Sequence, residues 1–381
     1  MPGLRRPPLR VLVWTAATVA LVVVAALLWR GSDAAATEST TAAPADVPSE
    51  TPAGAVSQAW SANGRQIPDT VVQGGVVLVG STHGVRALDL TTGREAWHYT
   101  RRNARMCGLT ATNGLAVAVF ATAKRCDEAV ALFADTGVRK WTRSVSFVPE
   151  MRLSSTYGIA LASSPGGFVA LDPVGDGVRW RYPAPGGCRL LDAEAGDTGI
   201  AVLEHCAGAD GVQLRLFGGY AGEKHWNLDI PVPEAQATKA QLLGADGVVT
   251  VIVGGELQVR SAADGKVLVR QPARGNVQQR SAGGVPFLLV DGELRALDPA
   301  TGAAVWTAPA IGLPTASTPD KKAGERVTVL VPEADGFVRR NPATGAEVGR
   351  SAVAGVPPGG VASSLGPVVV YRLDDRVLAF R

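Results

Sequence analysis

A glycine recurs eight times along this chain, roughly 40 residues apart and each time just ahead of an apolar segment. The eight are Gly75, Gly114, Gly158, Gly199, Gly247, Gly284, Gly324 and Gly366. In most repeats a second glycine and then a tryptophan follow, as Gly93 and Trp97, Gly137 and Trp141, Gly177 and Trp180, Gly222 and Trp226, and Gly302 and Trp306. A period of this length is typical of a four-stranded propeller blade.

Each repeat has the pattern of four short strands. In the first repeat, residues 69–73, 76–80, 85–90 and 96–99 are mostly apolar or β-branched, and turns containing glycine separate them. Glycine supplies the positive φ that tight hairpins require, and short connections make neighbouring strands antiparallel. We therefore predict an all-β domain built of four-stranded antiparallel blades.

The two ends of the repeat region complement each other. After Gly366 only 15 residues remain, which is room for three strands of an eighth repeat. A further strand is predicted around Trp60, and pairing it with the C-terminal strand would close the ring and remove both exposed edges. We predict an eight-bladed β-propeller over residues 55–381. Seven blades is the alternative, because the repeat around Gly349 is degenerate. A linear β-solenoid is less favoured, because it would leave the two end strands unpaired.

The N-terminus has the features of a membrane anchor. Val11 to Trp29 is 19 residues without a charge, long enough to cross a bilayer, and Arg5, Arg6 and Arg10 precede it. We predict a cytoplasmic basic segment over residues 1–10 and a transmembrane helix (a signal anchor) over residues 11–30. The result would be a single-pass cell-membrane protein whose C-terminal domain is extracytoplasmic. A cleavable signal peptide is the alternative, since three alanines follow at residues 34–36.

The segment over residues 31–54 carries three prolines, many Ala, Ser and Thr, and no aromatic residue. It cannot bury enough apolar surface to offset its ordering entropy, which predicts a disordered linker. Beyond residue 30 the chain has 33 basic and 34 acidic side chains. Nucleic acid is therefore not expected as a partner, because that would require a basic stripe.

Four cysteines in an exported chain predict two disulfides. Cys107 begins the first strand of the second repeat and Cys126 follows its second strand. Cys188 and Cys206 hold the matching places in the fourth repeat. The start of one antiparallel strand lies beside the end of the next, so we pair Cys107 with Cys126 and Cys188 with Cys206. The rival interpretation is a zinc site, which no Cys-x-x-Cys spacing supports.

The repeat pattern resembles that of eight-bladed propellers built from pyrroloquinoline-quinone-like repeats. The match is Ala-Leu-Asp-x-x-Thr-Gly-x-x-x-Trp, found at residues 87–97 and 296–306, and the likeness covers residues 55–381. In such proteins the tryptophan docks on the neighbouring blade. The resemblance implies this role for Trp60, Trp97, Trp141, Trp180, Trp226 and Trp306. The family divides into quinone-dependent dehydrogenases and non-enzymatic scaffolds, one of them a lipoprotein, whereas this chain has no lipid-accepting cysteine near its N-terminus.

The sequence does not favour catalysis. The quinone-dependent dehydrogenases usually have two adjacent cysteines over the cofactor, and this chain has no Cys-Cys pair. The four histidines, His83, His98, His205 and His225, have no metal-like spacing, and there is neither a Gly-x-Ser-x-Gly elbow nor a Walker loop. We expect no catalytic residues, no metal and no cofactor.

A surface for binding remains. The second and fourth repeats have longer loops, which also carry the cysteine pairs and basic residues. The candidate partner-binding residues are Arg101, Arg102, Arg105, Arg125, Arg189 and His205. We expect a monomeric, non-catalytic scaffold for a protein or cell-envelope partner; a solvated loop face is the plainer interpretation. The alternatives are a quinone-dependent or metal-dependent oxidoreductase, and a small-ligand sensor that uses the central channel.

Overall fold

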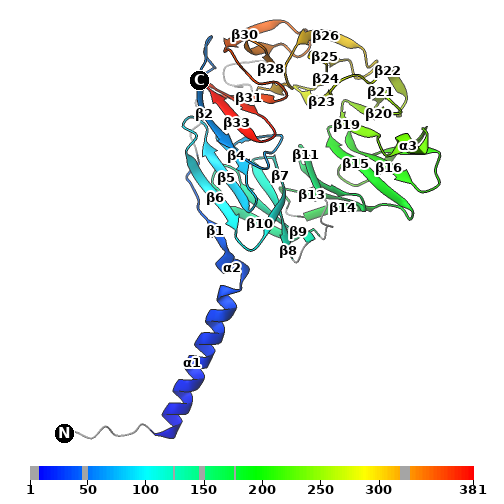
Figure 1. Ribbon diagram of the computed structural model, residues 1–381. Coiled ribbons are helices and arrows are strands. Elements are labelled where there is room, and N and C mark those ends of the chain that lie inside the picture. Colours follow the sequence, from blue (N-terminus) through cyan, green and yellow to red (C-terminus); the bar gives the residue numbers. More distant parts are fainter. Residues whose placement is uncertain (1–7, 45–49, 123–124, 146–150, 176, 318–326) are drawn as a thin grey trace.

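The computed structural model describes residues 8–44, 50–122, 125–145, 151–175, 177–317 and 327–381. Over these residues the chain forms eight antiparallel sheets arranged as a ring, with one long helix projecting from its edge (Figure 1). Each sheet is a four-stranded blade, and an additional strand joins the sheet of the first blade. The ring is an eight-bladed β-propeller, as the repeat predicts. The repeat glycine Gly324 lies outside the described residues.

Blades one to four follow the chain in order. Blade one holds β3 (Val72–Gln73), β4 (Val76–Gly80), β5 (Gly84–Asp89) and β6 (Glu95–Arg101); blade two holds β7 (Arg105–Thr112), β8 (Leu115–Thr122), β9 (Arg125–Phe133) and β10 (Arg139–Ser144). Blade three holds β11 (Arg152–Thr156), β12 (Ile159–Ser164), β13 (Gly167–Asp172) and β14 (Gly177–Pro183); blade four holds β15 (Cys188–Gly196), β16 (Gly199–Cys206), β17 (Gly211–Phe217) and β18 (Lys224–Pro231).

The short helix α3 (Glu234–Ala237) leads into the second half of the ring. Blade five holds β19 (Gln241–Asp246), β20 (Val248–Val253), β21 (Glu256–Ser261) and β22 (Val267–Pro272); blade six holds β23 (Val277–Ala282), β24 (Val285–Val290), β25 (Glu293–Leu297) and β26 (Ala304–Pro309). Blade seven holds β27 (Thr315–Ala316), β28 (Val329–Glu333), β29 (Gly336–Arg340) and β30 (Glu347–Ala352); blade eight holds β31 (Val361–Leu365), β32 (Val368–Arg372), β33 (Arg376–Phe380) and β2 (Gln58–Asn63).

The first strand of each blade lies innermost. The first strands of neighbouring blades, such as β11 and β15, contact each other around the central channel, and the fourth strands form the rim. The second and third strands are almost fully buried between blades, as in β4 and β8. Their apolar side chains, packed against those of the next blade, make up the core.

The ring closes where the sequence predicts. β2 pairs antiparallel with β33, with Trp60 opposite Ala379, and Ser57 and Arg381 exchange two backbone hydrogen bonds of 3.0 and 2.9 Å. The outermost strand of the last blade is therefore supplied by the N-terminal end of the domain. This arrangement pairs a sheet edge that would otherwise be open.

Six tryptophans join neighbouring blades. Each indole Nε1 donates a hydrogen bond of 2.8–3.1 Å to a backbone carbonyl near the turn between the third and fourth strands of the following blade. The donor and acceptor residues are Trp60 and Leu90, Trp97 and Ala134, Trp141 and Pro173, Trp180 and Gly219, Trp226 and Ala262, and Trp306 and Pro342. In several blades the indole ring of the tryptophan covers a glycine of that turn. A Cβ built on Gly137, whose φ is 73°, would lie 2.6 Å from the Trp97 ring.

Two blades lack this tryptophan, as the sequence indicates. Blade five has Val269 at that position, where it packs with Leu268 against Gly302 of blade six. Blade seven has Gly349, which is covered by the side chain of Arg339. Both blades retain four strands, so the degenerate seventh repeat is a true blade and the seven-bladed alternative is wrong.

The N-terminal region agrees with the sequence in part. Helix α1 (Leu9–Arg30) is the only helix among the described residues that is long and apolar enough to cross a membrane, a test that a signal sequence would also pass. The segment predicted as a disordered linker contains α2 (Asp33–Ala36) and β1 (Thr37–Ser39), so that prediction is wrong there. β1 pairs with the outer edge of β6, because the open rim of a blade offers unpaired backbone groups to any extended segment beside it.

We call the contact between each of these tryptophans and the turn of the following blade the tryptophan joint, and we expect it to stabilise the ring. Replacing Trp97, which is fully buried, with alanine should lower the free energy of unfolding by about 3–5 kcal/mol, since both the ring contacts and the Ala134 hydrogen bond are lost. Val269→Ala, at the matching place in blade five, is the control and should cost clearly less. Denaturant unfolding measures both. Equal losses would show that the joint is not a special source of stability.

Candidate functional site

The loops that precede the first strand of each blade and those between the second and third strands lie on one face of the ring. This face carries both disulfides, and we call it the disulfide face. Cys107 of β7 is bonded to Cys126 of β9, and Cys188 of β15 to Cys206 of β16. Both predicted disulfides are present, and each ties strand ends together directly beneath the loops of its blade.

The cysteine pairs differ in detail between the two blades. Cys188 and Cys206 face each other directly on adjacent strands, as the sequence argument assumed. Cys126 instead belongs to the third strand of blade two, which begins one residue earlier, at Arg125. Cys107 sits at a bulge in β7 between Met106 and Gly108. The bulge explains how a first strand can be bonded to a third across the strand between them.

Arg101 and Arg102 are both engaged within the protein. The Arg101 side chain is buried, and its guanidinium lies 2.5 Å from the Glu128 carboxylate and 2.7 Å from that of Asp33. Arg102 is exposed, but its guanidinium donates a hydrogen bond of 2.8 Å to the carbonyl of Ala35. The inclusion of Arg101 in a partner-binding surface is therefore wrong, because its side chain is buried and its charge pairs with the carboxylates of Glu128 and Asp33.

The other four candidates remain on the disulfide face. Arg105 and Arg125 are exposed at the starts of the first and third strands of blade two, and Arg189 is exposed on β15 in blade four. His205 lies opposite Arg189 on β16, half-buried, with its Nδ1 3.0 Å from the carbonyl of Gly211. The structure thus places three exposed arginines in two groups, one on each side of blade three.

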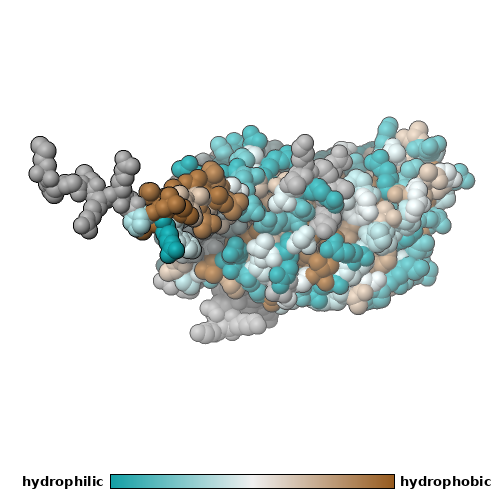
Figure 2. Space-filling model, turned by 90° about the horizontal axis from the view of Figure 1, so that it is seen from below, coloured by the Kyte–Doolittle hydropathy of each residue, from teal (hydrophilic) through white to brown (hydrophobic). Residues whose placement is uncertain are grey.

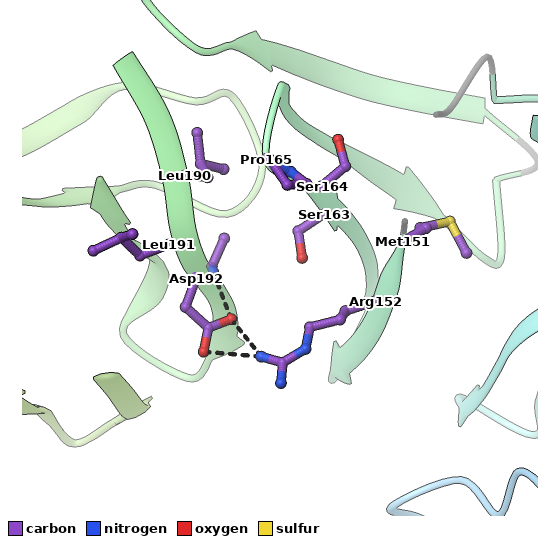
Figure 3. Close-up of a pocket in the computed structure, with 9 residues that line it drawn as sticks. Met151, Arg152, Ser163, Ser164, Pro165, Leu190, Leu191 and Asp192 are labelled. Atoms are coloured by element: carbon purple, nitrogen blue, oxygen red, sulfur yellow. Dashed lines mark hydrogen bonds and ion pairs between the residues drawn. The ribbon is translucent and has the colours of Figure 1, made fainter. Parts of the chain in front are cut away.

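A cavity of about 270 Å³ opens on this face between blades three and four (Figure 3). Its walls are apolar where Met151, Leu190 and Leu191 line it. On one side the Arg152 guanidinium reaches the Asp192 carboxylate, with Nη1 3.2 Å from both carboxylate oxygens. Arg152 is largely exposed, with 74% of its side-chain surface accessible, whereas Asp192 is 13% accessible. The cavity therefore combines an apolar wall with a solvent-facing cation.

Sequence reasoning missed this cavity. Arg152 and Asp192 are 40 residues apart, and only the packing of β11 beside β15 brings them together. A bulge between Leu190 and Asp192 also turns the Asp192 side chain away from the position that simple alternation predicts. The available signal was a charged residue in each of two neighbouring inner strands, at the start of β11 and in the middle of β15.

The cavity continues into the mouth of the channel, where a second space of about 340 Å³ is lined by residues that include Gln66, Ser154 and Glu194. Burial raises the pKa of the Glu194 carboxyl to about 8, and the nearby carboxylates of Asp192 and Asp69 add to the effect. Burial also raises the pKa of Asp192, which the Arg152 guanidinium opposes. At neutral pH Glu194 is thus mostly protonated and able to donate a hydrogen bond.

The described residues offer one cluster of possible metal ligands, Cys188, Glu204 and Cys206. Its two sulfur atoms are joined in a disulfide, and the Glu204 carboxylate lies 2.6 Å from the Arg215 guanidinium. Thiolates are the form of cysteine that binds metal, so this cluster does not fit a zinc ion.

The fold and the repeat define the class of protein: an eight-bladed propeller of pyrroloquinoline-quinone-like repeats. The family described as "Outer membrane protein assembly factor BamB" matches residues 53–156 and 210–380, more than half of the chain. The chain therefore belongs to this family. No curated protein sequence matches the chain.

Solved structures share the fold at low identity. BamB from Moraxella catarrhalis is 15% identical, with 86% of this chain and 99% of that chain covered and a TM-score of 0.47. The computationally designed Ika8 protein is 13% identical, with 88% and 99% covered and a TM-score of 0.50. Quinohemoprotein alcohol dehydrogenase ADHIIG from Pseudomonas putida HK5 is 14% identical, with 87% and 78% covered and a TM-score of 0.50. Likeness at these identities shows the fold alone.

The raised pKa of Glu194 predicts a pH dependence of stability. The folded chain keeps this proton up to about pH 8, whereas the unfolded chain releases it above its ordinary value of 4.5. Unfolding between these two values releases a proton, so stability should fall as pH rises from 4.5 to about 8. Above about pH 8 the carboxyl is ionised in both states, and this decline should stop. Thermal unfolding across this range should show a smaller decline for Glu194→Gln than for the wild type. Parallel declines would mean that Glu194 is ionised in the folded chain.

Proposed function

We propose that this chain is a membrane-tethered, extracytoplasmic propeller that binds a protein or cell-envelope partner through its disulfide face and catalyses no reaction. The family name refers to the assembly of outer-membrane proteins, which supports a role in holding another macromolecule. The apolar helix α1 supports attachment of the propeller to a membrane.

The observation that carries the proposal is the arrangement of the disulfide face. Two disulfide-bonded blades present the exposed residues Arg105, Arg125 and Arg189 on either side of blade three. Loops fixed in this way lose little conformational entropy when a partner binds. A surface that is already ordered and positively charged is suited to an acidic partner.

The cavity between blades three and four suggests how such a partner is held. Apolar side chains of the partner would fill the space beside Leu190 and Leu191, and an acidic group would pair with Arg152. An apolar anchor surrounded by charged contacts is the usual organisation of a protein interface. This combination favours a protein over a purely polar polymer.

The oxidoreductase alternative has less support. The six tryptophans that lie outside α1 each donate a hydrogen bond to a neighbouring blade, so none of them is available to stack on a quinone. Adding pyrroloquinoline quinone and Ca²⁺ should leave the unfolding temperature unchanged. A saturable upward shift, together with dye-linked activity, would favour the enzyme instead.

The binding surface is tested by charge reversal on the full-length protein. Arg105→Glu combined with Arg189→Glu should abolish recovery of the partner in a crosslinking pull-down from membranes, because it reverses the charge of both arginine groups. The control is Arg94→Glu combined with Lys224→Glu, which places the same charge change on exposed residues of the turns at the opposite face. Equal recovery with both variants would rule out the disulfide face as the binding surface.

A further inference from the structure

The N-terminal segment fastens the anchor helix to the rim of the ring. Residues 32–42, which we call the N-terminal strap, run along the outer edge of blade one. The backbone amide of Arg102 donates to Ala36, β1 pairs with β6, and the amide of Thr40 donates to His98. The strap also makes side-chain contacts, including the ion pair of Asp33 with the buried Arg101. It is a fifth strand of blade one and not a free tether.

The strap fixes where the anchor leaves the ring. Only Gly31 and Ser32 separate the end of α1 from the start of α2. The helix leaves at the rim and points away from the ring, close to blades one and two (Figure 1). Figure 2 views the molecule from the side to which α1 points. With α1 across a bilayer, the ring would stand on this rim, and both of its faces would stay accessible.

The rim of blade two, next to the strap, is basic and partly apolar. The amide of Ala42 at the end of the strap donates a 3.0 Å hydrogen bond to Thr136, in the turn between β9 and β10. In the same hairpin Phe133 is 40% exposed and is the only exposed phenylalanine among the described residues. Arg139 is also exposed, and the Lys140 ammonium lies 5.6 Å from the centre of the Phe133 ring.

This hairpin carries more basic than acidic side chains. Residues 133–144 contain three basic residues and one acid, the half-buried Asp135. Within the described part of the chain, neither Arg139 nor Lys140 has a carboxylate partner. Exposed valines recur on the outer strands of other blades, so Val138 alone carries little weight. This hairpin thus brings an exposed aromatic ring and two such cations to the part of the rim where the strap ends.

We propose that the rim formed by residues 133–140 rests on the bilayer surface that α1 crosses and contacts anionic lipid headgroups. The proposal rests on the membrane anchoring stated above. Arg139 and Lys140 would pair with lipid phosphates, while Phe133 enters the interfacial layer, where amphipathic groups with apolar bodies and charged ends are favoured. The contact would hold the disulfide face perpendicular to the membrane and open to a partner from the side.

The expected strength of the contact follows from its charge. Each cation near an anionic bilayer contributes about fivefold to the occupancy of the contact, equivalent to about 1 kcal/mol. Reversing both charges should therefore abolish the contact in a membrane that contains anionic lipid. A membrane of zwitterionic lipid should hold the rim weakly even in the wild type.

The test uses the full-length chain in lipid nanodiscs of phosphatidylcholine, alone or mixed with phosphatidylglycerol. Hydrogen–deuterium exchange of the peptide spanning residues 133–144 should slow severalfold when phosphatidylglycerol is present. Arg139→Glu combined with Lys140→Glu should remove this protection. The control is Lys224→Glu combined with His225→Glu, which occupies the same position at the start of β18, a quarter of the ring away. It should keep the protection, and unchanged exchange in β7 and β8 verifies folding.

The outcomes separate the two proposals. Equal exchange of this peptide in both kinds of nanodisc, with the chain still embedded, overturns the lipid contact and leaves the anchor intact. Loss of protection in the control as well as in the test variant also overturns it, since the effect would then be one of net charge. A chain that is cleaved near residues 34–36 and leaves the disc, as intact mass would show, overturns both the anchor and the contact.

Discussion

The joint between each outer-strand tryptophan and the turn of the next blade is the interaction on which the ring depends. A blade has two large apolar faces, and neither can be buried without a neighbour. The indole ring fills the space above the turn glycine, and its Nε1 satisfies a backbone carbonyl of that turn, as for Trp97 and Ala134. The same contact therefore supplies buried apolar area, a hydrogen bond and the relative position of the two blades.

This joint also decides which parts of the chain are free for function. The turns between the third and fourth strands are constrained by packing against a tryptophan in six of the eight blades. The opposite ends of the strands carry no such constraint, and there the loops differ between blades. The disulfides, the exposed arginines and the cavity beside Arg152 all lie at these unconstrained ends.

The strap fixes where α1 leaves the ring. Arg101 is the central residue of this connection, because its buried guanidinium pairs with Glu128 of blade two and with Asp33 of the strap. One side chain thus links the anchor, blade one and blade two. If the rim of blade two also contacts lipid, the two faces of the ring remain open, and a partner can approach without competing with the bilayer.

The sequence by itself determined the repeat, the number of blades, the closure through Trp60 and the C-terminal strand, and the pairing of the four cysteines. These features depend on local turn chemistry and on the spacing of the repeat, and both can be read from short stretches of consecutive residues. Only the tertiary structure decided that Arg101 is buried, that part of the supposed linker is a fifth strand, and that Arg152 meets Asp192 beside a cavity. Each of these depends on contacts between segments 27 to 70 residues apart, where burial and bulges set the direction of a side chain. A composition rich in Ala, Pro and Thr says that a segment cannot fold alone, but not that a neighbouring strand edge will order it.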